Sequence, residues 1–437
     1  MTADSPGQED LPNGLEFGVI KTDDELDELI KFSATVHNEL IAQQQRRLIE
    51  SLPGFGREMN FIIRELDSGE IVSSLSAIPC IWEYDGIELK SLELEFAGTS
   101  ESYRRKGLFR ILYRHFEEEL RRGEYHLSSL QGIPHFFRQF GYDFSFPLPQ
   151  FSGFELLTGQ IPSLMPEEDP NYMELTVRDA KKKDLDEITR LYDELGRRLL
   201  VRSGRSRDLW EMQEKLKTWR AFSFDTMVVE SDDQIEGYFR TITHDKDSPM
   251  TGVMGFTYLD VIESSIRNHN GVMRVLQHLK ETAQKEELQA IKVPGIESSN
   301  LSKVVLDLGA EKKIPWRYQI RIPDMVYFLK AISPALERNL VNTMFERMTQ
   351  DLTLNTYESC FSLKFENGRI SEVKELGPVG GGILNARPHD LVRLVFGELA
   401  ISELSELTPD CSVWSPLKSF VKTLFPKRES HMFYNRC

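Results

Sequence analysis

The chain has 437 residues, 40% of them hydrophobic, enough for about three globular domains of ordinary size. Lys and Arg total 53 against 69 Asp and Glu, which gives a formal net charge of -16. This excess of acid argues against a nucleic-acid-binding protein, because phosphate recognition depends on clustered Lys and Arg. It suits a cationic amine as partner, although it also serves solubility alone.

The cysteines and the ends of the chain indicate a cytoplasmic protein. Cys80, Cys360, Cys411 and Cys437 are too few and too scattered for a disulfide framework, and they form no CxxC pair for zinc or redox work. Residues 1–14 are polar and acidic, and we expect a disordered tail there rather than a signal peptide. No apolar run reaches the roughly 18 residues of a membrane span, so no membrane association is expected.

Residues 15–155 alternate short apolar runs with charged helical stretches, which predicts a mixed domain of the α/β (α+β) class. Strands are expected at residues 16–20, 60–65, 70–79, 81–84, 87–99 and 126–130, and helices at 23–41 and from 108 to 122. Gly123 ends the latter helix.

A proline-rich stretch leads into a second unit, residues 156–325, with the same alternation. Its expected strands are 174–180, 226–230, 235–242 and 252–261, and its expected helices are 184–195 and 271–285. The segment 107–112 aligns with 271–276, which supports tandem copies of one fold. Residues 326–437 predict a third unit, in which a helix over 325–347 precedes two strands, 352–358 and 360–365, and two helices, 388–396 and 400–404.

A basic turn with a glycine separates the strand that ends at Thr99 from the helix that begins near Leu108. Residues 104–106, Arg-Arg-Lys, gather positive charge, and Gly107 lets a ligand approach the backbone closely. Free N–H groups and the positive end of the helix dipole also meet there. The turn is therefore a candidate pyrophosphate site, with an exposed basic helix start as the alternative.

Two motifs in order carry a family resemblance. Residues 99–107 resemble the acetyl-CoA loop of the GNAT N-acetyltransferases, Gln/Arg-x-x-Gly-x-Gly/Ala, in which Phe109 departs from the last small residue. Residues 136–142, Phe-Phe-Arg-Gln-Phe-Gly-Tyr, are similar to the closing motif, aromatic-Tyr-x-x-Phe-Gly-Tyr. Residues 104–110, residues 388–397 and Leu424-Phe425-Pro426 extend the resemblance to the branch of the enhanced intracellular survival (Eis) acetyltransferases.

The resemblance implies tandem GNAT domains, each a mixed central sheet flanked by helices, followed by a C-terminal domain like sterol carrier proteins. The second copy is expected to be degenerate, because residues 267–271 have the wrong spacing from Arg to Gly and few charges. The implied co-substrate is acetyl-CoA, with no metal. The residues implied in its binding are Ala97, Gly98, Thr99, Arg104, Arg105, Lys106, Gly107, Leu108, Phe109 and Arg110.

Acetyl transfer needs a neutral amine, a polarised thioester carbonyl and a proton for the leaving thiolate. Glu93 and Glu95 lie on one face of a strand, so either can accept a proton unless they are only polar residues of a solvated face. The branch places its proton-donating Tyr where this chain has Phe137, which has no proton to give. Tyr142 is a candidate that a packed structural role also explains, and Cys437 offers a terminal carboxylate as base unless the tail frays.

The sequence thus predicts an acetyl-CoA-dependent N-acetyltransferase that acts on an amine of a small molecule or peptide by direct attack in a ternary complex. The alternatives are a GNAT-derived CoA-binding or regulatory protein without catalysis, suggested by Phe137, and a lipid or acyl-CoA carrier that uses the C-terminal domain. The resemblance implies a homo-oligomer, of which a hexamer is one form.

Overall fold

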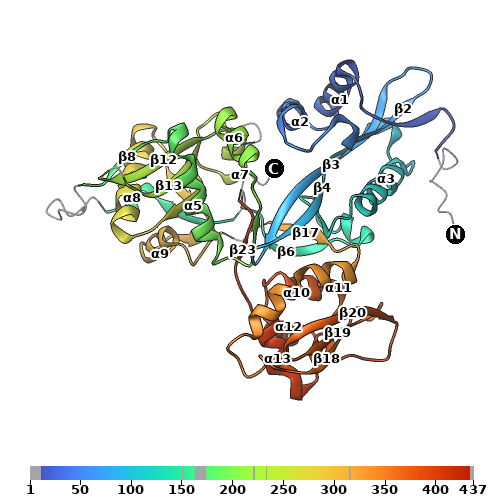
Figure 1. The fold of residues 1–437 in the computed structure, drawn as a ribbon. Coiled ribbons are helices and arrows are strands. Elements are labelled where there is room, and N and C mark those ends of the chain that lie inside the picture. The colour runs from blue at the N-terminus through green and yellow to red at the C-terminus, as the bar shows by residue number, and fades with distance from the viewer. Residues whose placement is uncertain are drawn as a thin grey trace.

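The protein is seen in a computed structural model as three large mixed sheets flanked by helices (Figure 1). The structure describes residues 11–149, 152–162, 174–219, 222–232, 234–313 and 316–433. The predicted α/β (α+β) class is confirmed.

The first sheet carries the candidate cofactor turn. Its strands are β1 (Leu15–Val19), β2 (Asn60–Glu65), β3 (Ile71–Tyr84), β4 (Ile87–Thr99), β5 (Leu127–Leu130), β6 (Asp143–Pro147), β9 (Val201–Ser203), β17 (Arg317–Arg321) and β23 (Ser430–His431). They follow the order β1-β2-β3-β4-β5-β17-β6, and β9 joins β3 to β23. Along the main path, β4 and β5 pair in parallel while the other neighbours pair antiparallel.

Helices α1 (Asp23–Val36) and α2 (Glu39–Ser51) lie to one side of this sheet and α3 (Leu108–Arg122) to the other (Figure 1). The single helix expected over 23–41 is wrong, because the chain breaks at residues 37 and 38. The Asn38 side chain accepts a hydrogen bond from the Ile41 N–H at 2.9 Å and so starts a new helix.

The second sheet follows the order β16-β7-β15-β14-β13-β12-β8. Its strands are β7 (Phe154–Leu157), β8 (Thr176–Asp179), β12 (Asp225–Ser231), β13 (Gln234–His244), β14 (Tyr258–Ile266), β15 (Ala290–Val293) and β16 (Glu311–Lys312). Its surroundings include α5 (Leu185–Gly196), α6 (Arg207–Leu216), α7 (Pro249–Met254), α8 (His269–Lys285), α9 (Asn300–Asp307) and the hairpin β10 (Thr218–Trp219) with β11 (Phe222–Ser223). From β8 to β15 the strand order repeats that from β1 to β5, and β14 and β15 again pair in parallel.

The strand expected over 252–261 is wrong at its start. Pro249 opens the short helix α7, and Gly255, at φ +84°, ends it before β14 begins at Tyr258. Proline is favoured in a first helical turn and glycine after a last one, so a helix was signalled where β propensity suggested a strand.

The two sheets exchange strands. β7, which follows β6 in the chain, lies in the second sheet between β15 and β16. β17, which follows β16, lies in the first sheet between β5 and β6. The stretches 15–155 and 156–325, predicted as separate units, therefore interlock.

The third sheet has the order β20-β19-β18-β21-β22. Its elements are α10 (Met325–Leu340), β18 (Gln350–Asn355), β19 (Cys360–Glu366), β20 (Arg369–Gly377), β21 (Leu384–Asn385), α11 (Pro388–Val395), α12 (Ile401–Leu407), β22 (Ser412–Val413) and α13 (Lys418–Leu424). The helix expected to reach 347 ends at Leu340, and Asn342 follows it at φ +59°. The short 3-10 turns of the chain are η2 (Arg57–Met59), η3 (Glu101–Tyr103), η4 (Phe136–Phe140), η6 (Thr158–Gln160), η7 (Lys182–Asp184) and η8 (Ser415–Leu417).

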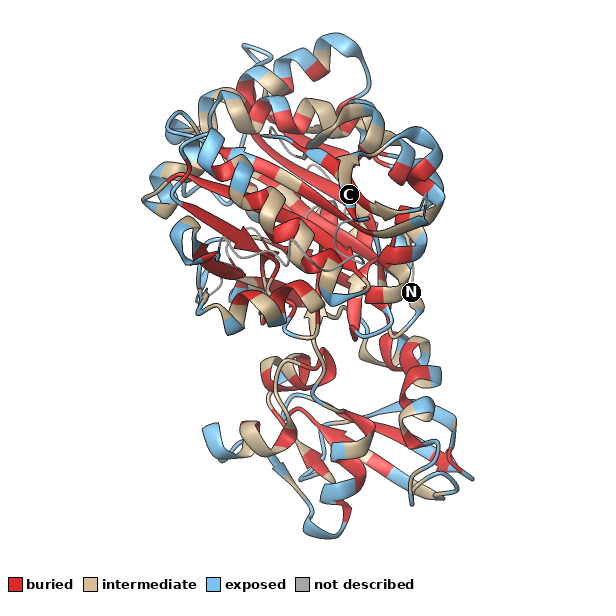
Figure 2. Cartoon of the chain, turned by 90° about the vertical axis from the view of Figure 1, so that its left-hand side faces the viewer, coloured by how far each residue is buried: buried red, intermediate tan, exposed pale blue. Residues whose placement is uncertain are grey.

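One cluster of buried side chains includes residues of both the first and the third sheet, and Figure 2 shows how the buried positions are distributed along the chain. The Tyr84 hydroxyl donates to the Val395 carbonyl at 2.8 Å, and the Trp82 and Phe396 rings lie 6.3 Å apart. The end of the described chain also turns back into the molecule, where Met432 and Phe433 are buried. The first sheet thus packs against the C-terminal part of the chain at Tyr84 and Trp82, and the end of the described chain adds the strand β23 to it through β9.

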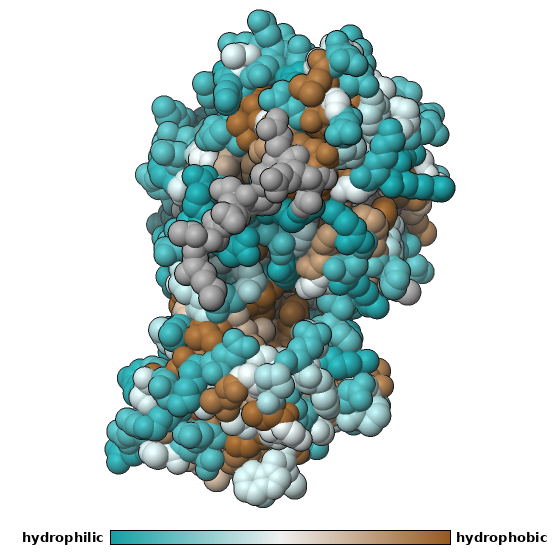
Figure 3. Space-filling model, turned by 90° about the vertical axis from the view of Figure 1, so that its right-hand side faces the viewer, coloured by the Kyte–Doolittle hydropathy of each residue, from teal (hydrophilic) through white to brown (hydrophobic). Residues whose placement is uncertain are grey.

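The face seen in Figure 3 is largely hydrophilic, with apolar groups gathered where the upper part of the molecule narrows toward the third sheet. Within the described ranges, none of the helices has both the length and the apolar character that a bilayer crossing requires.

Candidate active site

A bulge in β4 begins the site. Ser74 of β3 opposes Gly98 while Ser76 opposes Glu95, so Phe96 and Ala97 together face one residue of β3. Phe96 adopts φ +50° to allow this. Since β5 pairs with β4 only as far as Leu94, the two parallel strands part beyond that point.

A cavity of about 730 Å³ opens between the parted strands. Its lining comes from β4 (Leu94, Glu95, Phe96, Ala97, Gly98 and Thr99), from the basic turn and α3 (Arg104 and Phe109), from the end of β5 and the chain after it (Leu130, Gln131, Gly132, Ile133, Phe136 and Phe137), from the α1–α2 junction and α2 (His37, Ile41 and Gln44), and from Leu148 and Trp316. Five of the ten predicted cofactor residues therefore line one space: Ala97, Gly98, Thr99, Arg104 and Phe109.

The other five predicted cofactor residues form the start of α3. Arg105, Lys106, Gly107 and Arg110 are exposed, and Leu108 is buried in the core. Gly107 is the N-cap of α3 at φ +81°, and neither a side-chain cap nor an acidic residue occupies this first turn. The N–H groups at the helix start, the dipole and the nearby cations together suit a bound pyrophosphate.

Phe109, the departure from the small residue of the loop motif, has a packing partner in the closing motif. Its ring lies 5.5 Å from Phe136, 5.9 Å from Phe137 and 5.3 Å from Phe140. The two motifs thus meet as one aromatic cluster beside the cavity, which explains the tolerance of a large residue here.

The two candidate glutamates occupy different environments. Glu95 is half-buried and lines the cavity, whereas Glu93 is 1% exposed and is not part of the cavity wall. Their strand positions do share one face, since Glu95 opposes Ser76 and Glu93 opposes Ile78. Of the pair, Glu95 is the carboxylate that a substrate in this cavity can reach.

Tyr142 lies inside the core and is not part of the cavity wall. Its hydroxyl is 2.6 Å from Ser128 Oγ, and Ser128 in turn donates to the Leu92 carbonyl at 2.7 Å. Burial raises the pKa of Tyr142 well above its usual value. Phe137 does line the cavity, at the motif position where the GNAT pattern has Tyr. Cys437 lies outside the described residues.

His37 is a site residue that the sequence did not single out. It lines the cavity from the α1–α2 junction, and a Cβ built on Gly98 would stand only 3.3 Å from its Nε2. Desolvation lowers the pKa of His37, while the Phe96 carbonyl and the Glu95 charge oppose that shift. The sequence predicts one continuous helix over 23–41, which contains no junction to direct this ring into a cavity.

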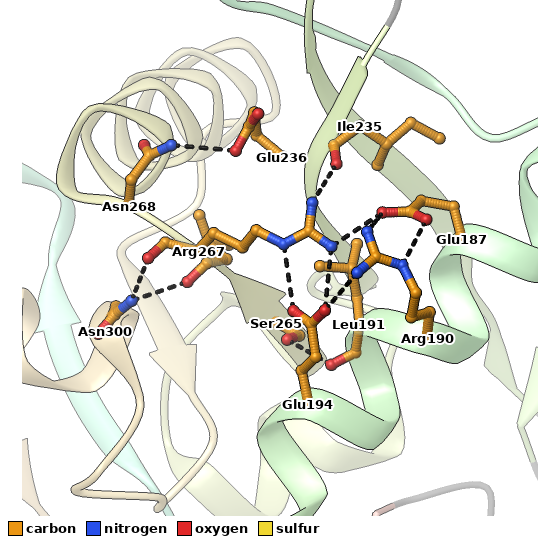
Figure 4. A network of polar contacts seen from close by, with 11 residues as sticks. Glu187, Arg190, Leu191, Glu194, Ile235, Glu236, Ser265, Arg267, Asn268 and Asn300 are labelled. Atoms are coloured by element: carbon orange, nitrogen blue, oxygen red, sulfur yellow. Dashed lines mark hydrogen bonds and ion pairs between the residues drawn. The ribbon is translucent and has the colours of Figure 1, made fainter.

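The corresponding end of the second sheet is filled by its own side chains (Figure 4). Arg267 follows β14, and its guanidinium donates to Glu194 at 3.1 Å, to Glu187 at 2.9 Å and to the Ile235 carbonyl at 3.0 Å. Arg267, the arginine of this loop, is therefore already engaged with the protein's own groups.

The start of α8 is closed in the same way. Asn268 Oδ1 accepts from the Gly271 N–H at 2.8 Å, so one of the amides that a phosphate would use is taken. Asn300 Nδ2 donates to the carbonyls of Ile266 and Arg267, both at 2.9 Å, across the end of the strand (Figure 4). The cavity beside Arg267 and Asn300 measures about 100 Å³. A separate hollow of about 360 Å³ borders Asn268, and it is lined by the carboxylates of Glu174 and Glu236, which do not suit a phosphate.

A family model described as an acetyltransferase (GNAT) domain matches residues 21–145, the stretch that holds the bulge, the cavity and the basic turn. Residues 21–145 therefore form a domain of the GNAT acetyltransferase superfamily. The superfamily implies acetyl-CoA as co-substrate. No curated protein matches the sequence.

Several solved structures are similar over 96% of this chain and 99% of theirs. They include a GCN5-related N-acetyltransferase from Anabaena variabilis (15% identity, TM-score 0.68), a probable N-acyltransferase from Enterococcus faecalis (13%, 0.70) and Eis1 from Mycobacterium abscessus (13%, 0.60). At these identities the likeness concerns the fold, and it confirms the predicted GNAT and Eis-type architecture.

Proposed function

We propose that this chain transfers the acetyl group of acetyl-CoA to an amine by direct attack within a ternary complex. The observation that carries this proposal is the single cavity that runs from Arg104 at the basic turn, along Ala97, Gly98 and Thr99, to Glu95. A thioester and an acceptor can meet in it without a covalent enzyme intermediate.

The chain fits the co-substrate at both of its ends. The uncapped start of α3 and the exposed cations beside it suit the pyrophosphate. Beyond Leu94 the β5-facing edge of β4 is released from the ladder, which leaves backbone groups for the pantetheine amides. Gly98 has no side chain to fill the space between β4 and the α1–α2 junction. When bound, acetyl-CoA supplies an activated acyl carbon.

The transfer moves one proton off the amine and one onto sulfur. The amine nitrogen attacks the thioester carbonyl carbon, the C–S bond breaks, the nitrogen loses a proton, and the thiolate takes one up. Glu95 and neutral His37 face the cavity from neighbouring walls and can accept the amine proton directly or through water. Phe137 has no hydroxyl, so the proton for sulfur comes from solvent or from the proton just removed.

The alternative of a CoA-binding protein without catalysis rests on the same Phe137, and one experiment separates the two. Acetyl-CoA binding is measured by calorimetry, and thiol release is followed with a panel of primary amines. We expect binding with turnover, and in Glu95→Gln at least about a tenfold loss of kcat/KM with unchanged affinity for acetyl-CoA. Glu88→Gln, on the exposed start of the same strand, is the matched control and should behave like the wild type.

Binding without turnover on any amine would favour the non-catalytic alternative. A protein that fails to bind acetyl-CoA would contradict both readings of the cavity.

A further inference from the structure

The walls of the cavity differ in chemistry. The polar members of the lining include His37 and Gln44, from the α1–α2 region, and Glu95, from β4. The lining also includes Ile133 and Trp316, which are 64% and 54% exposed, together with Phe136, 38% exposed, and these three form its apolar rim. Large apolar side chains that converge, exposed, on one cavity mark a surface that a ligand covers.

The rim is anchored rather than loose. β17 runs antiparallel to β5 with Gln319 opposite Leu130, and Trp316 before β17 and Ile133 after β5 both line the cavity. The Trp316 carbonyl accepts from the Leu148 N–H at 2.7 Å, and Gln319 Nε2 donates to the Gly132 carbonyl at 2.8 Å. These bonds fix the backbone on both sides of the apolar pair.

The charge of the lining limits what can sit there. Among the described lining residues, Glu95 is the single acidic side chain. One carboxylate pairs one ammonium group, and a second or third charge on the same ligand would lie against Trp316 and Ile133 without a partner. Burying an unpaired charge is costly, whereas covering apolar rim surface gains about 25 cal/mol per Å².

We propose that the acceptor is a primary amine on an apolar alkyl or aryl body, with the nitrogen at Glu95 and the body against Trp316 and Ile133. The proposal rests on the proposed acetyl transfer and names its substrate class. The negative net charge of the protein still attracts the protonated amine, while the apolar rim selects for an apolar body attached to that amine.

Pairs of amines of matched length test the proposal. Thiol release is measured with hexylamine against hexamethylenediamine, and with phenethylamine against spermidine. We expect kcat/KM to be at least about tenfold higher for the monoamine in each pair. Trp316→Ala should remove most of that preference, mainly by raising KM for the monoamines, with unchanged affinity for acetyl-CoA.

Trp414→Ala is the matched control, because Trp414 is 57% exposed, lies next to β22 in the third sheet and should leave the preference intact. A calorimetric titration of phenethylamine into the CoA-saturated protein tests the rim apart from turnover. It should show binding that Trp316→Ala weakens about tenfold.

Preference for the polyamines, or phenethylamine binding that Trp316→Ala leaves unchanged, would overturn the inference and leave acetyl transfer standing. Loss of acetyl-CoA binding and of turnover on every amine would instead overturn the proposed function.

Discussion

The ends of the two parallel strand pairs, β4/β5 and β14/β15, are built on the same topology and differ in what occupies them. In the first sheet the helix start is uncapped and a cavity of about 730 Å³ follows the strand. In the second, Asn268 caps the helix and Arg267 is bound to two glutamates. The cavity beside Arg267 measures about 100 Å³, and the hollow of about 360 Å³ at the helix start is lined by acidic Glu174 and Glu236. The topology therefore permits a cofactor site, and a few polar side chains decide whether it exists.

The acids of the two sheets show the same contrast. Glu95 of β4 faces a cavity, whereas Glu263 of β14 is buried and meets Arg205 at 2.5 Å and the Tyr238 hydroxyl at 2.7 Å. An acid that is committed to internal partners stabilises the fold and cannot serve a substrate. Five substitutions or conditions test this contrast, from the largest expected effect to the smallest.

Glu263→Ala should give the largest loss of stability. It leaves the guanidinium of Arg205 buried without its carboxylate, whereas Arg240 keeps Glu214 at 2.6 Å, and the loss of the Arg205 partner costs about 3–5 kcal/mol of unfolding free energy. Denaturant unfolding measures this loss, with Glu286→Ala, an exposed position at the C-terminal end of α8, as control. A loss as small as that of the control would show that the buried pair contributes little.

Gly107→Glu should weaken acetyl-CoA binding at least about a hundredfold, a loss of roughly 2.7 kcal/mol. No atom within 4 Å would meet a new Cβ, so the damage comes from negative charge at the helix start and from φ +81°. Gly255→Glu has the same open space and φ +84° in the second sheet and should leave binding intact. Equal effects of the two would refute the placement of the phosphates at α3.

Acidification should destabilise the protein through His431. Burial lowers the pKa of this ring from its ordinary 6.5 to about 3, against the charge of Glu263. The unfolded state therefore binds the proton first, and stability is complete above pH 6.5 and falls as the pH drops toward 3. From pH 6.5 to 5 the loss is about 2 kcal/mol by linkage. The unfolding free energies of the wild type and His431→Gln, plotted against pH, should diverge between pH 6.5 and 5. Parallel curves would contradict a role of His431 in the acid-induced loss of stability.

Phe137→Tyr should raise kcat by about tenfold, because it places a proton donor in the cavity wall beside the expected sulfur. Phe140→Tyr in the same 3-10 turn η4 lies off the cavity and is the control. An unchanged kcat in the Phe137→Tyr variant would mean that proton supply does not limit the rate.

Asn268→Ala should give the smallest effect. Loss of the cap costs about 1 kcal/mol of unfolding free energy, as should Asn38→Ala at the start of α2. No second acetyl-CoA should bind, because Arg267 and Asn300 still close the strand end. A second binding event in the titration would show that the cap alone keeps the second sheet empty.

The sequence was informative where chemistry is local. The basic turn from Arg104 to Gly107 and the aromatic closing motif are contiguous, so their partners in space follow from the motif order. Strand alternation makes Glu93 and Glu95 equivalent, yet only Glu95 lines the cavity. Glu95 comes directly before the bulge at Phe96, where β4 separates from β5. Such a bulge has no local sequence signal.

Residues brought in from elsewhere could not be predicted. His37 depended on a helix break set by the Asn38 cap, and Trp316 depended on a strand that joins a sheet far away in the chain. Tyr142 matched its motif, yet only the packing around Ser128 shows that its hydroxyl is turned into the core.

Through the strand exchange, the second sheet affects the first cavity even though its own strand end is closed: the chain passes through the second sheet before β17 returns to the first. Gln319 and Gly132 are hydrogen-bonded although they are 187 positions apart. The strands of the second sheet lie between them in the chain, so Trp316 and β17 are synthesised only after those strands. Contacts of such long range close late in folding. A nascent chain released before β17 would hold the whole GNAT motif and still lack one side of its acceptor cavity. The second copy thus sets the length of chain between the two parts of the first cavity wall, although its own strand end is occupied by Arg267 and Asn300.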